Sequence, residues 1–315
     1  MFNILGQEKN IKALVIGAGS IGLRHARLLS EMNAEVRFVS NRSDLAQEKY
    51  QDLETALQEW DPGLVVISNE TSKHLTTLVQ LFSLGYRKLT LVEKPLFSSI
   101  PNLQSLDTGK VFVGYNLRFH PLIQKLKEIL TSDVNIFNVT IYAGQYLPEW
   151  RPGTDYTKSY SAQKKEGGGV LRDLSHELDF IQFLFGKWQK LVSLGGQISA
   201  LNIETEDLFT IIIASQRSPI ISTTLSYLDK IYRREILVNT DQGTIYVDLI
   251  NGVININNNV SRMNIDRDFT YKKQYESLFE LNHSNLCTFE EGLDVVAMIE
   301  SIEESSRDQR WVIRN

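Results

Sequence analysis

A glycine-rich turn near the start of the chain carries the first chemistry that the sequence predicts. The segment 12–22 reads KALVIGAGSIG, in which a short apolar run leads directly into the glycines. Glycines with this spacing permit a tight turn, let backbone N–H groups approach a pyrophosphate and let the next helix pack closely on the strand. That helix presents unpaired N–H groups and a partial positive charge at its N-terminus. We therefore predict a dinucleotide site at Gly17, Gly19, Ser20, Ile21 and Gly22.

The residues after the second predicted strand bear on which dinucleotide binds. Strand 35–39 is followed by Ser40, Asn41 and Arg42, at the place where a dinucleotide fold meets the adenosine ribose. An acidic residue there accepts a hydrogen bond from the 2′-hydroxyl of NAD, whereas small donors and a cation suit the 2′-phosphate of NADP. We expect NADP as the cofactor. NAD is the alternative if Asp44 serves the hydroxyl instead.

The composition limits the classes of protein to which the chain can belong. Its 315 residues are enough for two domains, and 42% hydrophobic with 23% charged residues is typical of a globular protein. The formal charge of −5 provides no basic surface for nucleic acid. No apolar run approaches the roughly 20 residues that span a bilayer. Residues 1–10 show no export signal, so we expect a cytoplasmic protein without a membrane or nucleic-acid partner.

Cysteine and histidine usage argues against disulfides and metal sites. Cys287 is the only cysteine, which excludes a disulfide within the chain and a CxxC metal site. The histidines are scattered without the spacing of metal ligands, at positions 25, 74, 120, 176 and 283. We expect no metal. His74 is expected to serve in capping or packing, and His120 to be structural.

Short apolar runs alternate with helical segments over the first 118 residues. The expected strands are 13–16, 35–39, 64–67, 89–92 and 111–113, and helices are expected at 53–60 and 71–84. This alternation predicts a doubly wound parallel sheet, whose ligands bind at the carboxyl ends of the strands. Two strands deliver polar residues to that edge: Asn69, and then Glu93 with Lys94. We expect residues 1–118 to form a Rossmann dinucleotide-binding domain.

The pattern changes in residues 119–315. Helices are expected at 122–130, 170–185 and 289–306, a strand at 135–142, and about six further strands between 191 and 257. This predicts an α+β domain for substrate binding and oligomerisation, built on a large open, mainly antiparallel sheet. The strandless segment 144–166 is rich in Tyr, Trp and Arg, and long loops in compact domains are usually functional or disordered. Its composition favours function.

Four motifs stand in a fixed order along the chain: GAGSIG at 17–22, VEKP at 92–95, GYNLRFHP at 114–121 and GGGVLRDLSHELD at 167–179. Together they resemble the glucose–fructose oxidoreductase/inositol dehydrogenase/MocA (Gfo/Idh/MocA) family of NAD(P)-dependent enzymes, over nearly the whole chain. The resemblance implies hydride transfer between the nicotinamide and a hydroxyl or carbonyl carbon of a sugar, cyclitol or nucleotide-sugar. It also implies a homodimer or homotetramer formed through the C-terminal sheet.

The same resemblance implies two central catalytic residues. Lys94 matches the family's EKP lysine near the nicotinamide, where an ammonium group can hydrogen-bond the substrate hydroxyl and stabilise negative charge. Alternatively it only pairs with Glu93. Pro95 is often cis in the family, and we expect a cis bond here. His176 matches the histidine after the triple glycine and is the best acid–base candidate, although an isolated helical histidine is more often structural.

The carboxylate beside this histidine departs from the commoner family pattern. That pattern has the carboxylate four residues before the histidine, where this chain has Arg172, and Asp173 lies three before. Residues three apart still share a helix face, so Asp173 can enter the same pocket as a third catalytic residue. If Asp173 only caps the helix, Arg172 becomes a ligand for a substrate anion. Glu177 and Asp179 are expected to make solvent or interdomain contacts.

Further substrate contacts are expected from two segments. The resemblance places Asn116 and Arg118 in the cleft, although Arg118 could instead pair with a carboxylate between domains. In the loop 144–166, Trp150, Arg151 and Tyr156 could bind a polar substrate by stacking and charge. Arg151 and Arg172 together suggest an anionic substrate such as a nucleotide-sugar. Alternatively, the loop wraps a neighbouring subunit.

Three functional hypotheses follow from these patterns. The leading one is an NAD(P)-dependent oxidoreductase in which Lys94 and His176 handle the proton. The second is a dinucleotide-binding sensor without catalysis, which the altered Asp173–His176 spacing favours. The third is an enzyme that uses tightly bound NAD as a transient oxidant in hydrolysis or elimination.

Overall fold

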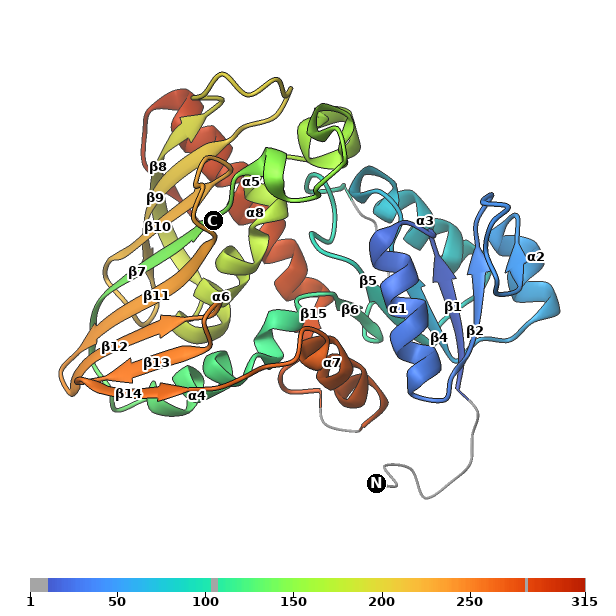
Figure 1. Cartoon of the computed structure of the whole chain (residues 1–315), viewed down its shortest axis with the longest axis horizontal. Coiled ribbons are helices and arrows are strands. Elements are labelled where there is room, and N and C mark those ends of the chain that lie inside the picture. Colours follow the sequence, from blue (N-terminus) through green and yellow to red (C-terminus); the bar gives the residue numbers. More distant parts are fainter. Residues whose placement is uncertain (1–10, 103–106, 281–282, 315) are drawn as a thin grey trace.

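The protein consists of two sheets with helices packed between them (Figure 1). The computed structural model describes residues 11–102, 107–280 and 283–314, so residues 1–10, which were examined above for an export signal, lie outside it. Within the described part of the chain, no helix is both long and apolar enough to cross a membrane.

The first sheet, sheet A, has the strand order of a dinucleotide-binding fold. Six parallel strands lie in the order β3-β2-β1-β4-β5-β6, and β15 (Cys287–Thr288) adds an antiparallel edge beside β6. Because β2 and β4 flank β1 on opposite sides, the strand order reverses beside β1, where ligands of such sheets bind. The parallel strands are β1 Lys12–Ile16, β2 Glu35–Val39, β3 Lys49–Tyr50, β4 Leu64–Ile67, β5 Leu89–Val92 and β6 Val111–Val113. The connecting helices include α1 Ser20–Glu31, α2 Leu53–Glu59 and α3 Thr71–Ser83.

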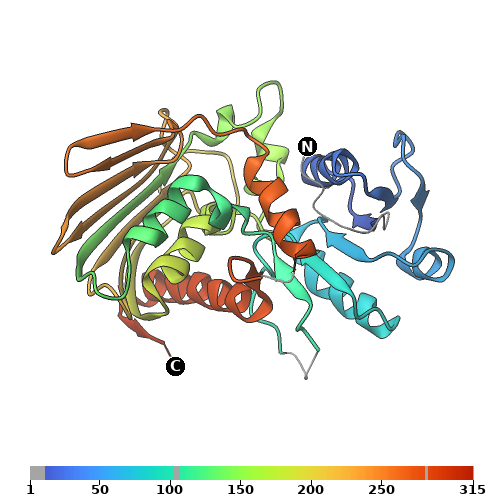
Figure 2. The same cartoon turned by 90° about the horizontal axis from the view of Figure 1, so that it is seen from below.

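The second sheet, sheet B, has nine strands, and only the pair β7–β10 is parallel. Buried and more exposed residues alternate along β9, as expected for a sheet with one face on the core. Helices α4 (Pro121–Ile129), α6 (Ser175–Phe185) and α8 (Phe289–Asp308) cover the face toward sheet A (Figure 2). The predicted fold class is confirmed. The strands are β7 Ile136–Gly144, β8 Trp188–Gly196, β9 Leu208–Ser215, β10 Ile221–Ser226, β11 Arg233–Thr240, β12 Gly243–Asp248, β13 Val253–Ile256, β14 Asn259–Arg262 and β16 Val312–Ile313.

The last part of the chain returns to sheet A, which the sequence analysis did not predict. Helix α7 (Phe269–Phe279) lies beside α1, and Asp268 just before it forms ion pairs with Arg24 and Arg27 of α1. Strand β15 follows and joins sheet A. The division into residues 1–118 and 119–315 stays a prediction, but β15 shows that sheet A takes a strand from beyond residue 118.

The single helix predicted over 170–185 is wrong, because the helix is broken at Leu174. Helix α5 (Val170–Asp173) ends there, and α6 starts at Ser175. The N–H of Glu177 bonds the carbonyl of Leu174, so it does not use the carbonyl of Asp173 as a continuous helix would. The Asp173 carbonyl accepts a hydrogen bond from Lys94 Nζ instead, at 2.7 Å.

A buried arginine joins three of these elements. Arg118, in the 3₁₀ turn η1 (Asn116–Phe119), is 1% exposed. Its Nη2 donates to Asp179 Oδ1 on α6 at 2.6 Å, and its Nη1 donates to Glu291 Oε2 on α8 at 2.9 Å. The structure therefore gives Arg118 carboxylate partners, the alternative that the sequence left open. Asp179 is fully buried rather than in contact with solvent, since it faces this guanidinium.

We predict that Arg118→Met lowers the free energy of unfolding by about 3–5 kcal/mol, because the substitution leaves Asp179 buried without its partner. Urea denaturation monitored by tryptophan fluorescence measures the change. Lys125→Met is the matched control, since the Lys125–Glu128 pair is exposed and should contribute less than about 1 kcal/mol. Equal effects of the two substitutions would show that the buried pair does not stabilise the fold.

Candidate active site

The glycine turn has the backbone geometry that a bound pyrophosphate requires. Gly17 has a φ of +93°, and a Cβ there would lie 2.7 Å from the backbone nitrogen of Asn69. A Cβ on Gly22 would lie 2.0 Å from the Gly17 carbonyl oxygen, so close packing of α1 on the turn requires glycine. The space around Gly19 is open, and no side chain caps α1. The first-turn N–H groups of α1, which include those of Ser20 and Ile21, are therefore available to an anion.

The end of β2 lies beside this turn and holds the residues expected to select the cofactor. Arg42 Nη1 donates to the Ala18 carbonyl at 2.6 Å, and its Nε and Nη2 donate to Asp44 at 3.0 and 2.6 Å. The hydrogen bonds from Arg42 lower the pKa of Asp44 to about 2. The Ser40 hydroxyl accepts from the Arg42 backbone N–H, and Asn41 is exposed. Arg42, the predicted ligand of the 2′-phosphate, and Asp44, the alternative ligand of the ribose hydroxyl, therefore lie together after β2.

Asn69 lies opposite the glycine turn, directly after β4. Its Nδ2 donates to the Thr77 hydroxyl at 2.9 Å, while its Oδ1 is buried and has no hydrogen-bond partner among the described residues. A buried amide oxygen without a partner is costly, so a ligand donor at this position would stabilise the site. The open Gly19, the uncapped α1 and this oxygen together fit a dinucleotide.

The EKP motif turns away from β5 and places Lys94 between the two sheets. The Lys94–Pro95 bond is cis, which confirms the expectation. Lys94 Nζ donates to the backbone carbonyls of Asp173 at 2.7 Å and Arg172 at 3.5 Å, so it does not simply pair with Glu93. Because both partners are neutral, the ammonium group keeps its charge for a substrate oxygen.

Glu93 is held by a buried network that includes the late helix α7. Its Oε1 lies 2.8 Å from His25 Nε2, and its Oε2 accepts from the Lys94 backbone N–H at 3.1 Å. His25 Nδ1 lies 2.6 Å from the hydroxyl of Tyr275 on α7. Burial opposes ionisation of Glu93, but the contact with His25 and the charge of Lys94 outweigh it and lower its pKa. The network therefore fixes the turn that carries Lys94.

His176 lies in the first turn of α6 and faces this region. Its ring meets that of Tyr115 edge to face, with centroids 5.6 Å apart, and its Nδ1 is buried without a described hydrogen-bond partner. Burial, together with the positive charges of Lys94 and Arg234, holds the pKa of His176 well below its usual value. The imidazole is therefore neutral at physiological pH and can accept a proton.

Asp173 and Arg172 point away from His176. The Asp173 Oδ2 accepts from the Tyr227 hydroxyl at 2.6 Å, and no described contact joins the Asp173 carboxylate to the imidazole. Arg172 Nη1 donates to Glu303 at 2.6 Å, and its Nε and Nη2 donate to the Ser98 carbonyl. A role for Arg172 in holding a substrate anion would require breaking these contacts.

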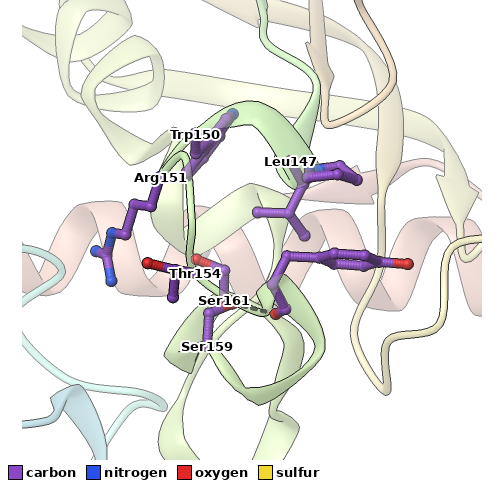
Figure 3. Close-up of a pocket in the computed structure, with 8 residues that line it drawn as sticks. Leu147, Trp150, Arg151, Thr154, Ser159 and Ser161 are labelled. Carbon is purple, nitrogen blue, oxygen red and sulfur yellow. Dashed lines mark hydrogen bonds between the residues drawn. The ribbon is translucent and has the colours of Figure 1, made fainter.

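The substrate residues predicted in the long loop surround only a small hollow. Trp150, Arg151 and Tyr156 line a cavity of about 10 Å³, which has room for about one water molecule (Figure 3). The Arg151 side chain lies at the opposite side of this hollow from Leu147, and Trp150 Nε1 donates to the Gln145 carbonyl. The hollow in the loop is too small for a sugar. Asn116, the further predicted substrate residue outside the loop, donates to the Thr270 hydroxyl at 2.6 Å.

Two charged residues near His176 were not predicted as site residues. Glu177 is fully buried beside Arg234 of β11, so the expected contact with solvent is wrong. Arg234 Nε lies 2.7 Å from Glu177 Oε1, but the angle is too poor for a hydrogen bond. Burial raises the pKa of Glu177. No sequence motif identifies Arg234, which lies in an ordinary strand. Among the described residues, no group of acidic, His or Cys side chains could hold a metal ion.

We predict that the His176 imidazole remains neutral at pH values well below 6.5. Because unfolded chains protonate histidine near pH 6.5 and the folded site resists protonation, His176 should also lower the stability of the fold as the pH falls below that value. A pH series of imidazole NMR spectra, with His176→Gln to assign the signal, measures the titration. A midpoint at or above 6.5 would contradict the burial and the two adjacent charges.

The fold is shared with solved dehydrogenase structures. GenD2 from gentamicin A biosynthesis, in complex with NAD, superimposes with a TM-score of 0.77 at 20% identity, covering 98% of this chain and 97% of GenD2. The WlbA dehydrogenase of Bordetella pertussis, in complex with NADH and UDP-GlcNAcA, gives a TM-score of 0.77 at 16% identity, covering 98% and 99%. At these identities, the similarity establishes the fold.

Sequence relatives match only part of the chain. The protein YteT of Bacillus subtilis (strain 168), whose name describes it only as an oxidoreductase, is 22% identical over 152 residues, which are 46% of this chain and 35% of YteT. The chain thus spans about a third of the length of this curated relative. Residues 123–246 match the model of the GFO/IDH/MocA C-terminal domain. This domain model describes the same family that the four motifs of the sequence resemble.

Proposed function

We propose that the protein is an NAD(P)-dependent oxidoreductase that acts on a hydroxyl or ketone carbon of a sugar, cyclitol or nucleotide-sugar. The observation that carries this proposal is the position of Lys94 Nζ at the carboxyl edge of the sheet that carries the glycine turn, where it donates to the Asp173 carbonyl three residues before the buried His176. GenD2 and WlbA, which share the fold, were solved with NAD and with NADH and UDP-GlcNAcA, respectively.

Each residue of the site has a distinct part in the proposed reaction. The turn at Gly17–Gly22 holds the pyrophosphate, and the bound nicotinamide supplies the hydride acceptor or donor. Lys94 hydrogen-bonds the reacting oxygen and stabilises negative charge on it as its proton leaves. His176 Nε2 or Nδ1 accepts that proton in oxidation and returns it in reduction. Asp173 orients the pocket wall through Tyr227 rather than acting on the proton.

We further propose that NADP is the preferred cofactor. Arg42 is anchored at the Ala18 carbonyl, which keeps its guanidinium beside the adenosine end of the turn. Its pair with Asp44 is exposed, and exposed ion pairs contribute little stability, so a 2′-phosphate can replace the carboxylate. If Asp44 keeps Arg42 and accepts from the ribose hydroxyl, NAD is preferred instead.

A sensor that binds dinucleotide without catalysis is the second candidate. The observation that favours it is the direction of the Asp173 carboxylate, which binds Tyr227 instead of orienting His176. A catalytic site without such an orienting carboxylate relies on Lys94 and on burial to determine the orientation and protonation of the imidazole.

We also propose that the protein forms a homodimer or homotetramer through the face of sheet B that the helices leave uncovered.

We predict that Lys94→Met and His176→Asn each lower kcat by roughly 10²–10⁴-fold, because each removes a group that handles the proton or the charge on the oxygen. Turnover is measured with NADH and NADPH across a panel of sugars, cyclitols and nucleotide-sugars. Lys88→Met, an exposed lysine paired with Asp61, is the control and should keep full activity. Cofactor affinity should change by only a few-fold. Full turnover in both site variants would refute the assignment, and binding without any turnover by the wild type would favour the sensor.

We predict that Arg42→Ala weakens NADPH binding by about tenfold and leaves NADH binding nearly unchanged, because a charge-assisted contact to the 2′-phosphate is worth about 1.5 kcal/mol. Fluorescence titration with both cofactors measures the two affinities. Asp44→Ala is the companion variant and should strengthen NADPH binding. A loss of NADH affinity in Asp44→Ala would instead identify Asp44 as the ribose ligand.

A further inference from the structure

A second cavity, with a volume of about 310 Å³, lies on the sheet B side of the candidate active site. It is formed by η1, the start of β11 and the segment between β14 and α7, which crosses from sheet B toward sheet A in Figure 1. Its volume is at the lower end of the range of small-molecule sites. Its polar lining includes His120, Arg234, Arg267 and the acidic Asp266, so basic residues outnumber the single acid.

Arg234 gives this cavity a permanent positive charge with unused donors. Its side chain is 13% exposed, and its Nε lies 2.7 Å from Glu177 Oε1. The two terminal nitrogens of its guanidinium have no hydrogen-bond acceptor within the described residues, although Arg234 lines the cavity. Glu177 lies beside Nε, but among the described residues its carboxylate oxygens form no hydrogen bond, so they do not engage the terminal nitrogens. A guanidinium in this state favours an oxyanion, which can accept two parallel hydrogen bonds.

His120 adds a neutral donor to the same wall. Its Nδ1 accepts from the Leu122 backbone N–H at 3.2 Å, so the neutral ring carries its proton on Nε2. Burial and the charge of Arg234 lower the pKa of His120 to about 4, which keeps the ring neutral at physiological pH. Within the described chain, Nε2 has no acceptor. His120 thus caps α4, in line with the structural role expected for it, and the cap leaves Nε2 as the free donor.

The cavity and the candidate catalytic groups lie within electrostatic reach of each other. The charge of Arg234 acts on His176, and the charges of both Arg234 and Lys94 act on Glu177. Arg234 Nε lies 2.7 Å from Glu177, which follows His176 in the chain, and Lys94 Nζ lies 2.7 Å from the carbonyl oxygen of Asp173, three residues before His176. A ligand that reaches both cations can place a reacting oxygen at Lys94 and an anionic group at Arg234.

We propose that this cavity binds the carboxylate or phosphate group of the substrate, with Arg234 and His120 as its donors. The inference rests on the proposed function, since it assigns the anionic end of a molecule whose other end reacts at Lys94. It also replaces Arg172 as the ligand for a substrate anion, because Arg172 is occupied by Glu303 and the Ser98 carbonyl.

Calorimetric titration of the full chain with three matched sugars tests the proposal. The probes are D-glucuronate, D-glucose 6-phosphate and D-glucose, at constant ionic strength and with a saturating concentration of NADPH or NADH, whichever binds more tightly, so that the glycine turn is already occupied. We expect at least one of the two acids to bind ten times more tightly than glucose, and which acid binds identifies the anionic group. Equal affinity for all three sugars, or no binding of either acid, would overturn the proposal.

Variants then show whether Arg234 is responsible. Arg234→Gln alone leaves Glu177 buried without a cation, so the double variant Arg234→Gln/Glu177→Gln serves as the better-folded test. Both should lose the tenfold preference for the acid, Arg234→Lys should keep part of it, and Arg262→Gln on the exposed β14 should keep all of it. An unchanged preference in the double variant would overturn the assignment. Failure of the wild type to bind either NADPH or NADH refutes the proposed function, whereas intact cofactor binding without anion preference refutes this inference alone.

Discussion

The candidate site depends on one hydrogen bond, from Lys94 Nζ to the backbone carbonyl of Asp173. The donor belongs to a cis turn after β5, and the acceptor is free because the helix breaks at Leu174. The two partners are 79 residues apart in sequence, so the bond forms only where the edge of sheet A meets the helices of sheet B. A carbonyl orients the ammonium group without neutralising it, whereas a carboxylate in the same place would form an ion pair and weaken its effect on a substrate oxygen.

A second set of buried polar groups holds in place the elements that form this contact. Glu93, His25 and Tyr275 connect the EKP turn to α1 and α7, and the pair of Arg118 with Asp179 connects η1 to α6. Each group buried without its partner would be strongly destabilising, so these networks tolerate few alternative arrangements. The late helix α7 is thus part of the support for Lys94, although it lies about 180 residues further along the chain. The rigidity of the site therefore comes from residues that have no chemical role in the proposed reaction.

Features that depend on local sequence could be predicted, and features that depend on distant partners could not. The glycine turn, the parallel strands and the edge position of Lys94 follow from short apolar runs and from glycine and proline, which act within a few residues. The break at Leu174 could not be predicted, because the apolar pattern continues through it and Lys94, which donates to the released Asp173 carbonyl, is 79 residues away in sequence. The burial of Glu177 depends on Arg234 in a strand 57 positions later, which no spacing rule connects to it. Helix α7 was missed because its buried positions include Thr270, Gln274 and Ser277, which weaken its apolar pattern.

The electrostatics of the site connects the charge of a substrate to the strength of the candidate base. Burial and the two cations Lys94 and Arg234 make His176 a weak base in the ligand-free protein. A neutral substrate would leave both charges in place and add further desolvation, so the imidazole would stay a poor proton acceptor. A substrate that places negative charge at Arg234 offsets one of these cations and raises the pKa of His176 toward the physiological range, where a general base is most effective. The position of Arg234 therefore matters for catalysis as well as for binding, since the same anion that would hold the substrate would also make His176 ready to accept its proton.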